Sequence, residues 1–144
     1  MLLDEVGARI IAAGYASSTG LGGWVLMKSR LPDSTALPDK LVAIIETAGL
    51  PSEARTEVDK PGFQLLVRGT SLQRGSSGYS EARSQAQSIK NDLHARGPGA
   101  LGTTAGSTQY YVGIWAQQDP FLLEYDAQNR PVIACNFLAQ RSRT

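Results

Sequence analysis

Histidine and cysteine, two residue types that often carry out covalent chemistry, occur once each in this chain. A nucleophilic site of the Ser–His–acid or Cys–His kind needs its base beside its nucleophile. The only histidine, His94, is far in sequence from the only cysteine, Cys135. We interpret His94 as a surface side chain near a helix C-terminus, where the helix dipole favours its charge. Cys135 lies in an apolar stretch that is typical of a buried, unreactive thiol. The sequence therefore predicts no catalytic residue.

Metal binding has equally little support. One histidine and one cysteine cannot build a zinc shell, and no acidic loop has the ligand spacing of a Ca²⁺ or Mg²⁺ site. We therefore predict no metal site. The single cysteine also excludes an intrachain disulfide, so we expect a fold that does not depend on an oxidising compartment.

One glycine-rich segment matches a cofactor motif by its letters. Residues 97–102 read Gly-Pro-Gly-Ala-Leu-Gly, which fits the G-x-G-x-x-G pattern of dinucleotide-binding loops. That loop must follow a strand and open a helix, so that the helix N-terminus meets the pyrophosphate. Here the glycines follow the end of a predicted helix and lead into a strand. We predict no cofactor and interpret residues 97–108 as a flexible loop.

The charge of the chain is nearly balanced. Fourteen Lys and Arg residues against thirteen Asp and Glu residues leave a net charge of +1, so no overall field attracts nucleic acid or a membrane. So low a net charge also does little to oppose self-association. The N-terminus is acidic where a signal peptide needs positive charge, and no stretch approaches the roughly 18 apolar residues of a membrane span. We expect an aqueous, cytoplasmic setting without membrane contact.

Hydrophobic periodicity predicts a single domain of residues 1–144 without internal repeats. We expect, in order, a helix at 2–14, strands at 24–28, 40–46 and 63–68, a helix at 79–93, an interrupted strand at 109–117 and 121–125, and a strand at 131–139. This order, α-β-β-β-α-β-β, predicts an α+β fold. Its sheet is expected to be mostly antiparallel and four- to five-stranded, with both helices packed on it.

Two local patterns predict finer details. Residues 47–62 are charged and contain four breakers, Gly49, Pro51, Pro61 and Gly62, which predict a long loop. Strict alternation in the strand at 109–117 predicts two faces. One face is expected to carry Tyr110, Val112, Ile114 and Ala116, and the other Tyr111, Gly113 and Trp115.

Three ordered segments carry a family resemblance. The first runs from Lys60 to Gly69, a strand that ends in arginine and glycine, and the second is Tyr79-Ser80-Glu81-Ala82-Arg83, which opens a helix. The third runs from Tyr110 through Gln118-Asp119-Pro120-Phe121-Leu122 to Asp126–Pro131 and Asn136-Phe137, and Leu31-Pro32-Asp33 also fits. Together, from about residue 24 onward, they resemble the tail-terminator (minor capsid) proteins of long-tailed bacteriophages. One departure is Asn129, which stands where similar proteins tend to have glycine; asparagine tolerates the positive φ of such a turn.

The resemblance implies a structural role without chemistry. Such proteins form a ring, usually of six subunits, on the end of the tail tube, stop its growth and join it to the connector beneath the head. The implied partners are other copies of this chain, the tail tube protein and the head–tail connector or stopper protein. DNA is expected to pass through the lumen of the ring without sequence-specific binding. The implied location is the tail and neck of the virion.

Charged residues at element ends and turns of the matched segments are candidate subunit or ring contacts. An exposed charge without a partner is an equally good interpretation of each, and one of them, Arg83, can also pair along its own helix. The candidates are Arg68, Arg74, Glu81, Arg83, Asp126 and Arg130.

Three other functions remain open. The chain fits another neck protein, an adaptor or stopper that seals the portal instead of ending the tube. It also fits a small-ligand-binding domain that uses residues 97–108 as a lid. An enzyme could use carboxylates alone, such as Asp119 with Glu124, but a bond-making pair must converge in a pocket, and nothing in the sequence indicates that these two converge.

Overall fold

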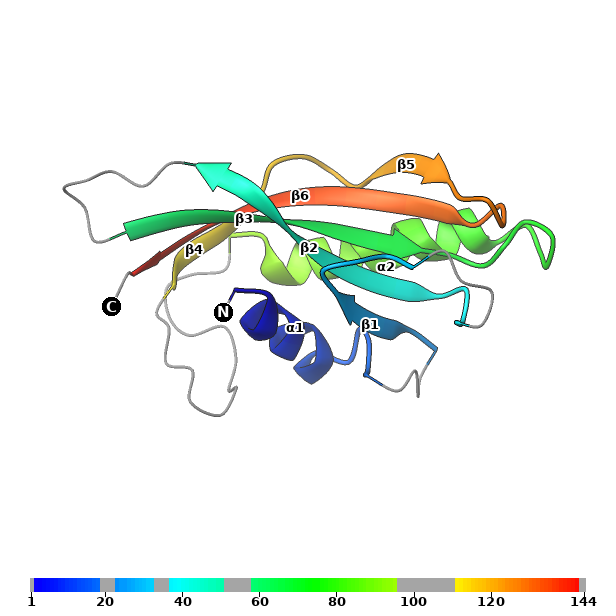
Figure 1. Cartoon of the computed structure of the whole chain (residues 1–144), viewed down its shortest axis with the longest axis horizontal. Helices are drawn as coiled ribbons and strands as arrows, with labels where there is room; N and C mark the ends of the chain where they lie inside the picture. The colour runs from blue at the N-terminus through cyan, green and yellow to red at the C-terminus, as the bar shows by residue number, and fades with distance from the viewer. Residues whose placement is uncertain (1, 19–22, 33–36, 51–57, 96–110, 143–144) are drawn as a thin grey trace.

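Six strands form one sheet, and two helices lie on the same side of it (Figure 1). The computed structural model describes residues 2–18, 23–32, 37–50, 58–95 and 111–142. Its elements are α1 (Leu2–Ala12), β1 (Val25–Lys28), β2 (Leu41–Leu50), β3 (Val58–Arg68), α2 (Gly78–Leu93), β4 (Tyr111–Ala116), β5 (Phe121–Tyr125) and β6 (Pro131–Ser142). Neither described helix is long and apolar enough to cross a membrane.

The strand order is β1-β2-β3-β6-β4, with β5 also paired to β6. Only β1 and β2 are parallel, and the other pairs are antiparallel. The prediction of an α+β fold with a mostly antiparallel sheet is therefore confirmed. The strands number six because β4 and β5 pair separately along the same side of β6, with residues 117–120 between them.

The core lies between the helices and one face of the sheet. The apolar stripes of the two helices are buried there, at Leu3, Val6 and Ile10 of α1 and at Ala82, Ala86, Ile89 and Leu93 of α2. Phe63 of β3 and Phe137 of β6 stack beneath them, with their ring centroids 4.9 Å apart. Gly14 ends the first helix segment with a φ of 83°, as glycine readily does. Tyr79, the first residue of the predicted helix, is exposed, whereas Gly78 before it is buried.

Neither of the described helices lies over the other face of the sheet. A small cluster lies there, made by Ala43, Leu66, Val132 and Ala134, with Leu31 packed against it. We call this side the open face.

The prediction of a loop over residues 47–62 is wrong at both ends of this range. Strand β2 continues to Leu50 and β3 begins at Val58, so most of the predicted breakers lie inside strands. The pairing skips between Thr47 and Leu50, which marks a β-bulge, and Gly49 has a φ of 65° there. A Cβ on Gly49 would lie 2.4 Å from the Lys60 carbonyl oxygen, so the bulge requires glycine. Pro51 lies outside the described residues.

The predicted alternation in β4 is also wrong. The register shifts between Tyr111 and Gly113, so that Tyr111 and Ile114 are both buried while Val112 is exposed. A bulge adds one residue and thereby reverses the faces on either side of it. Tyr110 and the segment 97–108, with its glycine motif, lie outside the described residues.

Candidate assembly surfaces

The single cysteine and the single histidine, the residues best suited to covalent chemistry, both make structural contacts. Cys135 is fully buried, and its Sγ lies 3.3 Å from the Gln118 carbonyl oxygen, to which it donates. Burial raises the pKa of this thiol to about 11, so it is protonated at neutral pH. His94 Nδ1 accepts a hydrogen bond from the Ala116 N–H at 2.9 Å and ties the end of α2 to the end of β4. His94 is exposed at the C-terminal end of α2, as the sequence indicated, and this contact holds it in place.

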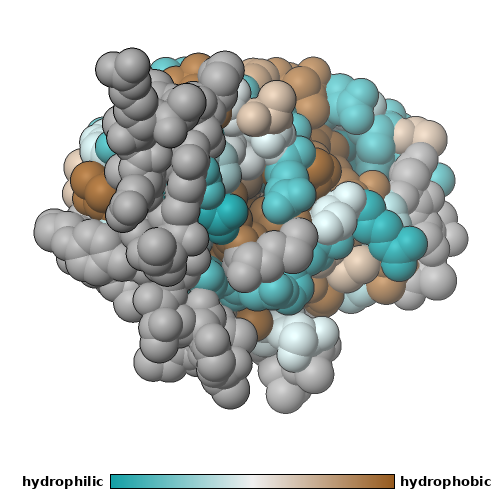
Figure 2. Space-filling view, turned by 60° about the vertical axis from the view of Figure 1, so that its left-hand side comes forward, coloured by the Kyte–Doolittle hydropathy of each residue, from teal (hydrophilic) through white to brown (hydrophobic). Residues whose placement is uncertain are grey.

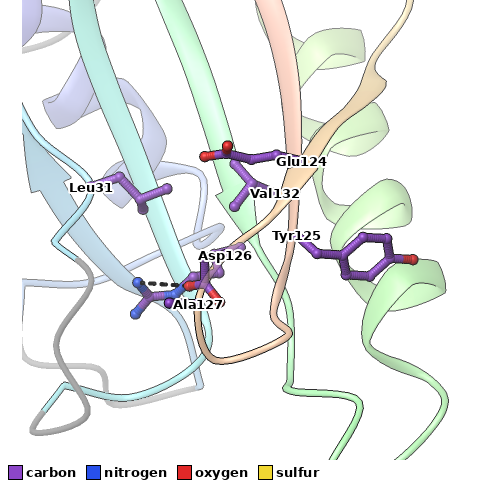
Figure 3. Close-up of a pocket in the computed structure, with 7 residues that line it drawn as sticks. Leu31, Glu124, Tyr125, Asp126, Ala127 and Val132 are labelled. Carbon is purple, nitrogen blue, oxygen red and sulfur yellow. Dashed lines mark ion pairs between the residues drawn. The ribbon is translucent and has the colours of Figure 1, made fainter.

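The carboxylates of the enzyme alternative do not form a converging pair. Asp119 forms an ion pair with Lys90 of α2, on the helix side of the sheet. Glu124 lines a pocket on the open face with Leu31 and Val132 (Figure 3). In the described ranges, no group of three or more His, Cys, Asp or Glu side chains is arranged to hold a metal ion.

Four charged side chains meet at one end of the sheet, and we call Asp39, Arg68, Asp126 and Arg130 the ionic cluster. Arg68, the last residue of β3, is fully buried. Its guanidinium donates to three backbone carbonyl oxygens of the segment before β2: Pro32 at 2.6 Å, Pro38 at 2.9 Å and Asp39 at 2.9 Å. It also lies 3.9 Å from the Asp126 carboxylate, the ion pair dashed in Figure 3. Arg68 therefore fixes this segment against the sheet.

Arg130 completes the ionic cluster from the turn between β5 and β6. Its Nε donates to Asp126 Oδ2 at 2.8 Å, and its Nη1 lies 3.5 Å from Asp39 Oδ1. Asp126 Oδ1 also accepts the backbone N–H groups of Gln128 and Arg130, both at 2.9 Å. Burial raises the pKa of Asp126, but the hydrogen bonds from Arg130 and Gln128 more than offset burial, so that the pKa lies below its usual value.

The ionic cluster also joins the loop between β3 and α2. Ser71 donates its N–H to Asp39 Oδ2 and its hydroxyl to the Gln128 carbonyl oxygen. Asn129, at a φ of 57°, provides the turn expected from the sequence, and its carbonyl accepts the Leu72 N–H. Three loops are thus held together at one end of the sheet.

The remaining predicted contacts lie around or beyond the ionic cluster. Arg74 is exposed and reaches Asp39 at 3.4 Å. Glu81 accepts hydrogen bonds from Thr70 and Ser77, and Arg83 donates to Gln87 of its own helix at 3.0 Å. The structure thus brings Arg68, Arg74, Asp126 and Arg130 together. Sequence reasoning missed Asp39, although its place directly before a buried strand was a signal.

The burial of these side chains limits how they could contact another subunit. Arg68 and Arg130 are each only 1% exposed at their side chains. A role for them in subunit contacts stays a prediction, and it would act through the loops that they hold. Among the other members of the predicted set, Arg74 is exposed and Glu81, Arg83 and Asp126 are partly buried.

Strand β5 differs from the ionic cluster because its side chains are apolar and exposed. All five of its residues are exposed, including Phe121 at 38%, Leu122 at 39%, Leu123 at 47% and Tyr125 at 43%. Among the described strands it pairs with β6 alone, and a register shift leaves Leu123 as an extra residue outside the register. Edge strands are normally protected by lysine, proline or a cover, but the only charge in β5 is Glu124. We call Phe121–Tyr125 the β5 edge.

A second apolar feature lies at the end of the sheet opposite the ionic cluster. Leu50, Trp115 and Leu138 line a shallow groove of about 220 Å³ on the open face. The Trp115 ring lies over Gly113, where a Cβ would come within 2.8 Å of it. Hydrophobic surface also appears in Figure 2 in several places between hydrophilic side chains. The two ends of the sheet thus differ, since one is ionic and the other apolar.

Comparisons with known proteins agree with this fold. A family model for the bacteriophage tail terminator protein matches residues 16–143. A chain in the virion of a native gene transfer agent (GTA) particle is similar in structure, with a TM-score of 0.67 and 17% sequence identity. The alignment covers 98% of this chain and 94% of that chain, and at this identity it shows a common fold. No curated protein sequence matches the chain significantly.

Proposed function

The chain belongs to the bacteriophage tail terminator family, and on that premise we propose that it forms a ring that caps the tail tube and joins the tail to the head connector. It is a structural protein of the virion, located in the tail and neck. The observation that carries the proposal is the family match, which includes every strand and α2 within residues 16–143.

The structure supports a capping role because its two ends differ. A ring that ends a tube must match the tube on one face and must not offer the same face again on the other. The strands run between the loops of the ionic cluster and the apolar groove at Leu50 and Trp115, so a ring with its axis along the strands has two unlike faces. We infer that residues 1–144 act as one domain in this ring.

The proposed partners are other copies of this chain, the tail tube protein and the head–tail connector or stopper. Arg74, Glu81 and Arg83 are proposed polar contacts, because charge pairs at a rim set register and orientation. Arg68, Asp126 and Arg130 are proposed to act by fixing the loops that make such contacts. DNA is proposed to pass through the lumen without sequence-specific binding, and no enzymatic step is part of the function.

Electron microscopy of particles from a phage that lacks this gene tests the proposal. Overlong or irregular tail tubes are expected, because only loss of a cap lets the tube keep growing. Tails of normal length that are separated from heads would instead indicate a neck adaptor or stopper. Normal infectious particles would contradict any structural role. Expression of the wild-type chain from a plasmid should restore normal tails and is the control.

A further inference from the structure

The β5 edge and β1 lie at opposite edges of the sheet and at the same level along the direction of the strands. Successive pairings place Val25, Leu41, Arg68, Val132 and Glu124 on one rung across the sheet. Following the pairings also shows that β1 and β5 run in opposite directions, because β1 is parallel to β2 and the next three pairs are antiparallel. A second copy rotated about an axis along the strands would therefore bring its β1 antiparallel to β5.

The two edges carry side chains of opposite charge. Glu124 lies on the β5 edge, and Arg30 follows β1 directly after Ser29. In the part of the chain that the structure describes, neither side chain has an ion-pair partner. Leu31, the next residue, packs against the cluster on the open face that includes Val132, and Val132 is paired with Glu124. The chain at Arg30 therefore lies next to a residue that packs on the rung of Glu124.

Apolar side chains are also exposed near both edges. The β5 edge presents Phe121, Leu123 and Tyr125. Helix α1, which packs against β1 and β2, leaves Ile11 43% exposed. Ser17 already pairs with the outer side of β1, since its carbonyl accepts the Leu26 N–H at 2.9 Å. A contact at this flank is therefore made mainly by side chains and does not simply continue the hydrogen-bonded ladder.

We propose that the β5 edge binds the β1 flank (Ile11, Ser17, Lys28 and Arg30) of a second copy of this chain, head to tail. This contact rests on the proposed ring and gives it a subunit interface. Pairing of β5 with β5 of another copy would place two Glu124 side chains near each other, and like charges that face each other across strands are destabilising. A head-to-tail contact between unlike edges avoids this repulsion and, when the rotation closes, forms a ring.

Cysteine crosslinking in purified particles tests the contact. A chain with Arg30→Cys and Leu123→Cys, treated with a short bis-maleimide, should give a ladder of subunit multiples on a denaturing gel. Each single substitution should give none, because Cys135 is buried. The matched control joins Arg30→Cys with Leu72→Cys, which is also 47% exposed but lies in the loop of the ionic cluster.

Three results of the crosslinking experiment would overturn the proposal. Dimers from Leu123→Cys alone would show that β5 faces itself and would overturn the proposal. So would the absence of a ladder from the double variant in assembled particles, or an equal ladder from the control pair. All three results would leave the terminator role intact, because that role is tested separately by the tail lengths of particles that lack the gene.

A charge exchange keeps the proposal testable if the cysteine variants do not assemble. Glu124→Arg and Arg30→Glu should each weaken self-association of the purified protein by roughly threefold per contact, as expected for an exposed ion pair. The double exchange should restore it, as measured by light scattering after size exclusion. Failure of the double exchange to restore association would overturn the pairing of these two edges.

Discussion

The ionic cluster and the β5 edge use their side chains in opposite ways. At the ionic cluster, two arginines and two aspartates satisfy one another and three loops, and both arginines are buried. At the β5 edge, four large apolar side chains are exposed and lack a cover within the subunit. A dense group of charges here marks internal structure, whereas the surface available for assembly is marked by apolar side chains. Substitutions at the ionic cluster should therefore act mainly on stability, and those at the β5 edge mainly on assembly.

Removal of Arg68 should have the largest effect on stability. Arg68→Ala leaves three carbonyl oxygens without their donor and Asp126 without one of its cations in a buried site. We expect a loss of about 3–5 kcal/mol in the free energy of unfolding, measured by urea denaturation. Arg74→Ala is the control: it also removes a partner of Asp39, but Arg74 is exposed, so the loss should be about 0.5 kcal/mol. Equal losses for the two variants would contradict the account.

The connection between β3 and α2 should tolerate added volume poorly. A Cβ on Gly78 would lie 2.0 Å from the Thr70 carbonyl oxygen, and one on Gly69 would lie 2.2 Å from that of Gly78. We expect Gly78→Ala to reduce the free energy of unfolding by about 3 kcal/mol, since backbone must move. Gly75→Ala in the same loop meets no atom within 4 Å and should leave the thermal midpoint unchanged. A stable Gly78→Ala protein would show that this loop is not fixed.

Acid should weaken the ionic cluster. Hydrogen bonds hold the pKa of Asp126 below its ordinary value of 3.8, so its contribution to stability is present above that value and is lost as the pH falls through the folded pKa. The free energy of unfolding should therefore decrease as the pH is lowered below about 4. Asp126→Asn should show a shallower fall over this range. Identical pH profiles for the two proteins would exclude Asp126 as a source of acid sensitivity.

Changes at the β5 edge should have the smallest effect on stability. Leu123 is half exposed and lies outside the register of β5 with β6, so Leu123→Lys should change the free energy of unfolding by about 0.5 kcal/mol or less. The same change should abolish complementation of a phage that lacks the gene, because a lysine opposes strand-edge contacts. Val112→Lys, at a similarly exposed position in β4, is the control and should complement. Full complementation by Leu123→Lys would remove β5 from the assembly surface.

The sequence predicted the helices, the fold class and the sheet because these depend on local periodicity. Buried residues of α1 and α2 recur at steps of three and four, as the stripes required. The turn at Asn129 was also correct, because the tolerance of asparagine for positive φ is local information. Arg68, Asp126 and Arg130 were singled out as subunit or ring contacts, which stays a prediction. Their meeting within the subunit and the burial of both arginines were not predicted.

The errors all arose where tertiary pairing decides the outcome. Gly49 and Pro61 were interpreted as loop residues because a β-bulge cannot be distinguished from a turn by composition. The bulge at Tyr111 reversed the expected faces of β4 for the same reason. Asp39 was missed because only the register of β2 with β3 brings it beside Arg68. The β5 edge was predicted as a strand, but its exposure depends on what lies over it in three dimensions.

A cryo-EM reconstruction of the neck of purified particles tests the central claim most directly. The account predicts a closed ring of this chain at the head-proximal end of the tail tube, with β5 of each subunit against the β1 flank of the next. The ionic cluster should lie within each subunit and should keep the same contacts in the ring. A ring in which β5 faces solvent, or tails with no copy of this chain at the end of the tube, would contradict the account.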